Sequence, residues 1–162
     1  TTGKQITGLY TAGDLDQCSE CMARTLWAAG VRKEDILQNA YGYGLFTGGL
    51  GFHQGAAPIG CTVVPTSSGL TERQITIMKD FGTTVLCCTP TYAIRLTEVA
   101  AEEEINLSRS KIRRIIVAGE PGGRHLNTSA SRKKPGISCP LLRNWSRHII
   151  ARRITESSGS RA

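Results

Sequence analysis

Residues 83–118 have the sequence TTVLCCTPTYAIRLTEVAAEEEINLSRSKIRRIIVA, and this stretch decides the fold class. Its two apolar runs, Thr83–Cys88 and Ile112–Ala118, have the length and composition of strands. Between them we expect a helix over Pro90–Glu104. Pro90 is compatible with it, because proline is tolerated in the first turn of a helix. A strand, a helix and a second strand in this order predict a βαβ unit with parallel strands.

The same alternation extends toward the N-terminus. Apolar residues recur every three or four positions over Asp14–Ala29, which predicts a helix that stops at Gly30. We expect a short strand at Ile36–Asn39, a buried strand at Cys61–Pro65 and a helix at Thr71–Phe81. The whole pattern predicts an α/β fold with a mainly parallel sheet and flanking helices.

Three local expectations are less determined by the pattern. Gln5–Tyr10 is a short strand candidate, and Phe46–Ala57 is rich in glycine and therefore ambiguous as a helix. A capping box is expected at the start of the helix over residues 71–81, with Ser68 or Thr71 paired to Gln74.

The loops that follow the predicted strands are rich in glycine. In open parallel sheets, ligands bind at the carboxyl ends of the strands. We therefore expect Tyr41–Gly44, Thr89–Tyr92 and Gly119–Gly123 to lie together at one edge of the sheet, although this placement alone names no reaction.

The composition favours a soluble globular chain. Of the 162 residues, 40% are hydrophobic and 20% are charged, which argues against disorder, collagen and a coiled coil. No run approaches the roughly 18 apolar residues of a membrane span, and no signal-peptide pattern is present. We expect a cytoplasmic protein without a membrane partner.

The net positive charge lies entirely in the last quarter of the chain. Residues 1–120 contain 11 basic and 12 acidic side chains, whereas residues 121–162 contain nine basic side chains and one acidic one, Glu156. Residues 124–162 also lack a sustained period. A basic run can bind nucleic acid, but Trp145 is its only aromatic residue, so no specific nucleic-acid partner is expected.

Cysteine and histidine give no metal or catalytic signature. Cys18 and Cys21 form a single C-x-x-C pair within a predicted helix, and no second pair completes a zinc site. Cys61, Cys87 and Cys88 lie in apolar strands and are expected to be buried. His53 has no nucleophile or carboxylate at a diagnostic spacing, so we interpret it as a packed or surface histidine.

The first four residues, Thr1-Thr2-Gly3-Lys4, have the composition of a phosphate-binding loop. They do not form a Walker A motif, because Gln5 follows the lysine where that motif needs Ser or Thr. The chain has no initiator methionine, and we interpret it as a piece of a longer protein.

A series of short motifs in fixed order carries a family resemblance. The series comprises TTGK at 1–4, NAYGYGLFTGGLG at 39–51, TERQ at 71–74, TPTY at 89–92 and GEP at 119–121. It closely resembles phenylacetate–coenzyme A ligase and its relatives among the adenylate-forming enzymes. The resemblance covers roughly residues 1–123, which implies part of an N-terminal AMP-binding domain followed by a basic tail, frameshifted or disordered, over residues 124–162.

The resemblance implies a two-step reaction. A carboxylate attacks the α-phosphate of Mg·ATP to give an acyl-adenylate, and the thiol of coenzyme A then displaces AMP. The cofactors would be ATP, Mg²⁺ and coenzyme A. The implied site residues fall in three groups: Thr1, Thr2, Gly3 and Lys4 for phosphate; Tyr41, Gly44 and Phe46 for the acyl group; Gly119, Glu120 and Pro121 for adenine. Tyr41 and Phe46 could equally well serve only to pack the sheet edge.

Several family motifs are not found after Gly123, including the acid that helps to hold Mg²⁺ and the C-terminal domain with its lysine. We therefore identify no catalytic or metal residue and expect this chain alone to be inactive. The alternative is a non-catalytic remnant or interaction module that binds nucleotide weakly. Self-association through an exposed sheet edge and the identity of the carboxylate stay open.

Overall fold

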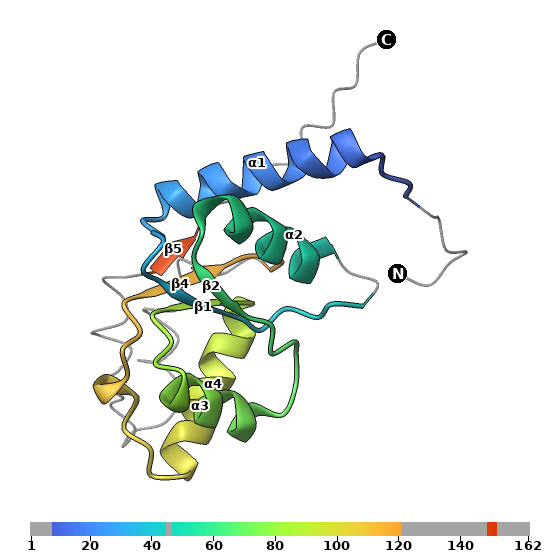
Figure 1. Ribbon diagram of the computed structural model, residues 1–162. Coiled ribbons are helices and arrows are strands. Elements are labelled where there is room, and N and C mark those ends of the chain that lie inside the picture. The colour runs from blue at the N-terminus through green and yellow to red at the C-terminus, as the bar shows by residue number, and fades with distance from the viewer. Residues whose placement is uncertain (1–7, 45–46, 121–148, 152–162) are drawn as a thin grey trace.

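The computed structural model describes residues 8–44, 47–120 and 149–151, the last three as backbone. Five parallel strands form its sheet, in the order β2-β1-β3-β4-β5 (Figure 1). The strands are β1 Ile36–Asn39, β2 Thr62–Val64, β3 Val85–Cys88, β4 Arg114–Val117 and β5 Ile149–Ala151. The predicted α/β fold with a parallel sheet is thus confirmed.

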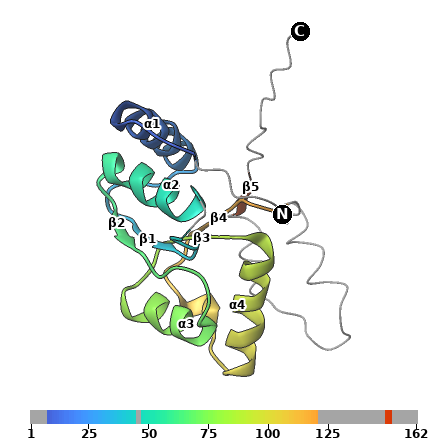
Figure 2. The same ribbon diagram turned by 90° about the vertical axis from the view of Figure 1, so that its right-hand side faces the viewer.

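Helices cover both faces of the sheet (Figure 2). One face carries α1, Ala12–Ala28, and α2, Thr47–Ala56, and the other carries α3, Thr71–Asp80, and α4, Pro90–Glu102. Two short 3₁₀ helices, Ala57–Ile59 and Leu107–Arg109, lie in the connections. This layering explains why the central strand β3 is apolar along its length, since both faces of a parallel sheet are buried.

Adjacent residues of β3 belong to the two different cores. Cys87 packs with Leu26 and Phe52 beneath α1 and α2, whereas Cys88 packs with Leu96 beneath α4 on the opposite face. All four residues of β3 are buried, and the expectation that Cys61, Cys87 and Cys88 are buried is confirmed. β3 is therefore the central strand around which the two layers are built.

The glycine-rich segment forms the closely packed helix α2. A Cβ atom at Gly55 would collide with the side chain of Met22 on α1, and one at Gly49 would collide with the carbonyl of Gly42. Glycine disfavours a helix by roughly 1 kcal/mol per residue. Here close packing against α1 and the loop after β1 outweighs that preference.

Two local predictions were wrong. β2 is not buried, because it is the edge strand and Thr62 is exposed. The start of α3 has no capping box: its N-cap is Leu70, which makes no side-chain cap bond. Gln74 is instead turned inward, where its amide donates to the carbonyl of Ser67 and its side-chain oxygen accepts from Gln38.

The remaining differences lie near the chain ends. Residues 8–10 of the strand candidate at the N-terminus are irregular, and its other residues lie outside the described part. β5 comes from residues 124–162, where the sequence pattern predicts no sustained structure. Of the helices in the described ranges, none has the length and apolar character that a membrane crossing requires.

Candidate active site

Tyr41 joins the carboxyl ends of three strands. It follows β1 by two residues, and its hydroxyl donates to the carbonyl of Cys88 at the end of β3, at 2.5 Å. The same oxygen accepts from the N–H of Ala118, just after β4, at 2.8 Å. These bonds fix the relative positions of the three loops that begin there.

The surroundings of Tyr41 keep its hydroxyl neutral. Its ring stacks on Phe52 of α2, with centroids 4.9 Å apart and planes 3° from parallel, and only 9% of the residue is exposed. Burial raises the pKa of Tyr41 well above its ordinary value. We call the Tyr41 hydroxyl and its two backbone bonds, to Cys88 and from Ala118, the Tyr41 clamp. The clamp therefore carries no charge.

A second chain of hydrogen bonds runs beside this clamp. The side-chain amide of Asn39 donates to the carbonyl of Gly49 and to the hydroxyl of Tyr43, both at 2.8 Å. The Tyr43 oxygen lies 3.1 Å from Nδ1 of His53. Because a carbonyl can only accept, the orientation of the Asn39 amide is determined by Gly49.

This chain of hydrogen bonds ends at His53. Both amide protons of Asn39 are used, and the Tyr43 hydroxyl accepts one of them and makes a further bond with His53 Nδ1. Burial also raises the pKa of Tyr43, although the bond from Asn39 opposes the shift. His53 is thus a packed histidine, as expected.

The third part of the edge lies at the start of α4. Thr89 caps the helix by accepting from the N–H of Tyr92, at 3.3 Å. The carboxylate of Glu120 accepts from the hydroxyl of Thr91, at 2.7 Å, and from its N–H, at 3.3 Å. A carboxylate at a helix N-terminus is favoured by the helix dipole. Gly119 reaches this position with φ +87°, a conformation that favours glycine.

The three predicted loops therefore share one edge of the sheet. Tyr41 contacts the backbone after β3 and β4, and Thr91 contacts Glu120. Gly44 has open space where a side chain would stand. The other predicted site residues, Thr1, Thr2, Gly3, Lys4, Phe46 and Pro121, lie outside the described residues. The roles assigned to all these positions stay predictions.

Sequence patterns did not indicate the parts that Asn39 and Thr91 play at this edge. Asn39 is a polar residue at the end of β1, and it is fully buried. A buried amide needs partners, so its position was a signal for a loop folded over the strand end. Within the described ranges, no group of three or more His, Cys, Asp or Glu side chains could hold a metal ion.

Comparison with known proteins points to one group of enzymes, although no family model matches the chain. The phenylacetate-coenzyme A ligase of Thermus thermophilus is 46% identical over 121 residues, which are 75% of this chain and 27% of that protein. The enzyme of the same name from Pseudomonas putida is 40% identical over 133 residues, 82% of this chain and 30% of that protein. This chain is a relative of the phenylacetate-coenzyme A ligases.

The solved structures agree with this relationship. A 2-hydroxyisobutyryl-CoA ligase in complex with 2-HIB-AMP and CoA, in the thioesterification state, matches with a TM-score of 0.73 and 28% identity. The match covers 76% of this chain and 27% of the ligase. The resemblance expected from the motif series is confirmed, and the chain spans about a quarter of the length of the curated ligases it matches.

Proposed function

We propose that this chain is part of a ligase that activates an arylacetate with ATP and transfers the acyl group to coenzyme A. The similarity to phenylacetate-coenzyme A ligases, at 46% identity over 121 residues, is the observation that carries the proposal. The solved relative that holds an acyl-adenylate and CoA supports the same order of chemistry. Phenylacetate is the first acid to test.

In this proposal the carboxyl edge of the sheet holds the acyl-adenylate. Gly119, Glu120 and Pro121 border the adenine, and Tyr41, Gly44 and Phe46 line the acyl pocket. The hydrogen bonds of Tyr41 and Glu120 support this assignment, because they hold both segments in fixed positions before a ligand arrives. Thr1, Thr2, Gly3 and Lys4 are assigned to the phosphates, where N–H groups and one cation stabilise transferring oxygens.

Magnesium bound to ATP takes one or two protein carboxylates together with phosphate oxygens and water. Glu120 is an exposed carboxylate at this edge, and it accepts from Thr91 through both oxygens. No group of three or more potential ligands is present in the described ranges. We therefore derive no step through Mg²⁺ from these residues.

We propose further that residues 1–123 form part of an AMP-binding domain, that residues 124–162 are foreign to it apart from β5, which pairs with β4, and that the chain alone binds an adenylate without turnover. The clamp at the carboxyl edge supports binding, and the small share of each relative that is matched supports the lack of turnover. We place the protein in the cytoplasm.

Two assays on the full chain test these statements separately. Calorimetric titration with a phenylacetyl-sulfamoyl adenosine, an inert acyl-adenylate analogue, should give saturable binding that the guanosine analogue does not give. Lack of binding to a folded chain would overturn the proposed site.

Phenylacetate-dependent release of pyrophosphate from Mg·ATP should not exceed that of a Lys4→Ala variant. Release above that control would support the ligase assignment and overturn the proposed lack of turnover.

A further inference from the structure

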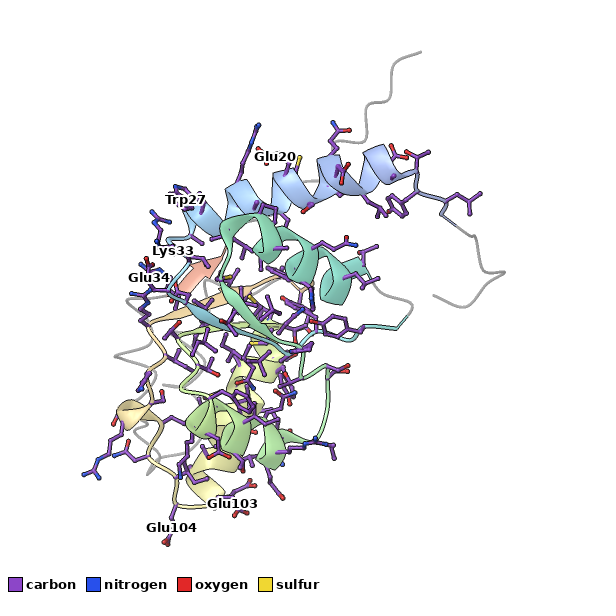
Figure 3. All side chains as sticks on the ribbon, in the orientation of Figure 1. Glu20, Trp27, Lys33, Glu34, Glu103 and Glu104 are labelled. Atoms are coloured by element: carbon purple, nitrogen blue, oxygen red, sulfur yellow. The ribbon has the colours of Figure 1, made fainter. Side chains whose placement is uncertain are left out.

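The solvent-facing side of α1 carries two thiols one turn apart. Cys18 and Cys21 are both free and exposed, within the helix rather than at its end. Glu20 and Trp27 lie on the outer side of the same helix (Figure 3). The opposite side packs on α2, where Ser19 donates to the carbonyl of Gln54 at 2.7 Å. The two cysteines are therefore accessible without any opening of the fold.

Helix geometry decides what this pair can do. Residues three apart on a helix have Cβ atoms about 5–6 Å from each other. A disulfide needs a Cβ separation of about 3.5–4.5 Å, so its formation would distort α1. An atom bound by two sulfurs at about 2.3 Å, with an angle of roughly 90–110° between the bonds, holds them about 3.3–3.8 Å apart. Two thiols reach that separation by side-chain rotation alone.

The pair lacks the further ligands of a metal site. Structural zinc takes four ligands, and the described ranges offer no group of three or more His, Cys, Asp or Glu side chains. The pair therefore suits a thiophilic centre that takes two sulfurs and needs no more protein ligands. Trivalent arsenic with one organic substituent is such a centre.

We propose that Cys18 and Cys21 form a two-thiol site for trivalent arsenicals of the type R–As=O. Each thiol replaces one bond of arsenic to oxygen, so that two As–S bonds form. The oxygen leaves as water and carries away both thiol protons. Arsenic stays trivalent, and no oxidant or reductant is needed.

The other described cysteines do not compete for this ligand in the folded chain. Cys87 and Cys88 are adjacent in sequence but belong to the cores on opposite faces of the sheet. Cys61 is buried, and burial raises the pKa of all three thiols. Only unfolding would expose Cys87 and Cys88 together.

The test treats the folded full chain with one equivalent of phenylarsine oxide, followed by excess glutathione and mass spectrometry with peptide mapping. We expect one phenylarsenic adduct on the peptide that contains residues 18 and 21, resistant to this monothiol and removed by 2,3-dimercaptopropanol. Cys18→Ser and Cys21→Ser should each lose the resistant adduct. The sixth cysteine of the sequence, Cys139, is the control, and Cys139→Ser should keep the adduct.

A variant with a changed spacing between the two thiols distinguishes chelation by both thiols from reaction with two independent ones. Cys21→Ser combined with Glu20→Cys keeps two exposed thiols but places them on different sides of the helix, so the resistant adduct should be lost. Breaking the exposed Arg24–Glu20 pair costs little stability. An adduct that survives in either single serine variant, that maps to Cys87 and Cys88, or that glutathione removes from the unmodified chain would overturn the proposal.

Discussion

At the amino ends of β1, β3 and β4 the strands are joined by a buried carboxylate, whereas at their carboxyl ends they are joined by a neutral phenol. Asp35, just before β1, accepts from the hydroxyl of Thr84, from the N–H of Arg32 at 2.9 Å, and from Arg113 at 2.6 Å. Tyr41 instead exchanges bonds with the backbone of Cys88 and Ala118.

Under the proposed function, this difference separates the edge that stabilises the fold from the edge that binds the ligand. The amino edge uses a charge that its own partners satisfy, and Asp35 is completely buried. The carboxyl edge keeps charge out of its clamp and leaves Thr91 and Glu120 exposed. In the proposed site, a ligand therefore meets a prearranged backbone and does not have to displace a charged pair such as Asp35–Arg113. The following predictions test this contrast, from the largest expected effect to the smallest.

Asp35→Ala should have the largest effect. It leaves the Thr84 hydroxyl and the Arg32 N–H without their acceptor, and we expect the free energy of unfolding to fall by about 3 kcal/mol in urea denaturation. Arg113→Ala is the matched control, because that side chain is 47% exposed and its loss leaves the other bonds to Asp35 in place. It should cost about 1 kcal/mol. Equal losses in the two variants would contradict the buried-carboxylate account.

Tyr41→Phe should cost less than Asp35→Ala. The ring can still stack on Phe52, but the Cys88 carbonyl and the Ala118 N–H lose the hydroxyl, which should lower the free energy of unfolding by about 1–2 kcal/mol. Tyr10→Phe, at a tyrosine that is 56% exposed, is the control and should change stability by less than about 0.5 kcal/mol. A Tyr41→Phe variant as stable as the unmodified chain would show that the hydroxyl clamp is dispensable.

The stabilisation that Asp35 and Tyr41 contribute at the two edges should be lost at opposite ends of the pH scale. Burial by itself would raise the pKa of Asp35, but the hydrogen bonds from Thr84, Arg32 and Arg113 outweigh it, so the pKa lies below its ordinary value. Its stabilisation is complete above about pH 4, the unfolded value, and is lost as the pH falls through the folded pKa. Tyr41 has a raised pKa, so its contribution is complete below about pH 10 and declines above it.

Denaturation at several pH values checks these signs. Asp35→Asn should have a lower free energy of unfolding than the unmodified chain at pH 7, and this deficit should shrink below pH 4. The deficit of Tyr41→Phe should be largest below pH 10 and should shrink at higher pH. An Asp35→Asn variant whose deficit is the same at pH 3 and pH 7 would contradict the assignment of the charge.

Thr91→Val should have the smallest effect on stability. Its contacts with Glu120 are exposed, and such contacts contribute at most about 1 kcal/mol. We expect a change below about 0.5 kcal/mol, together with faster amide hydrogen exchange at Gly119 and Glu120. Unchanged exchange would show that Thr91 does not hold this loop.

Sequence patterns predicted the elements better than their contacts. The apolar runs and helical periods located β1, β3, β4 and the helices α1, α3 and α4, because those patterns depend on neighbours close in the chain. The buried Asp35 clamp could not be predicted in this way, since Thr84 and Arg113 lie 49 and 78 residues away. The inward turn of Gln74 likewise depends on Gln38, which is 36 residues away.

The residues at the carboxyl edge show the same difference between what local patterns predict and what distant contacts decide. The glycine-rich loops were correctly predicted to meet at one edge, because strand ends in a parallel sheet share an edge. The aromatic side chain of Tyr41 could line a pocket or pack the sheet, and its sequence position did not distinguish these. Its stacking on Phe52 and its backbone bonds were decided by segments that meet only in the folded chain.

Amide NMR of the full chain, titrated with the phenylacetyl-sulfamoyl adenosine, tests the central claim most directly. The account predicts saturable shifts at residues 39–44, 89–92 and 118–120, with residues 32–36 and 113–114 at the amino edge unchanged. Shifts concentrated at the amino edge, or no saturable shifts in a chain whose spectrum shows it to be folded, would contradict the claim that the carboxyl edge is built for an acyl-adenylate.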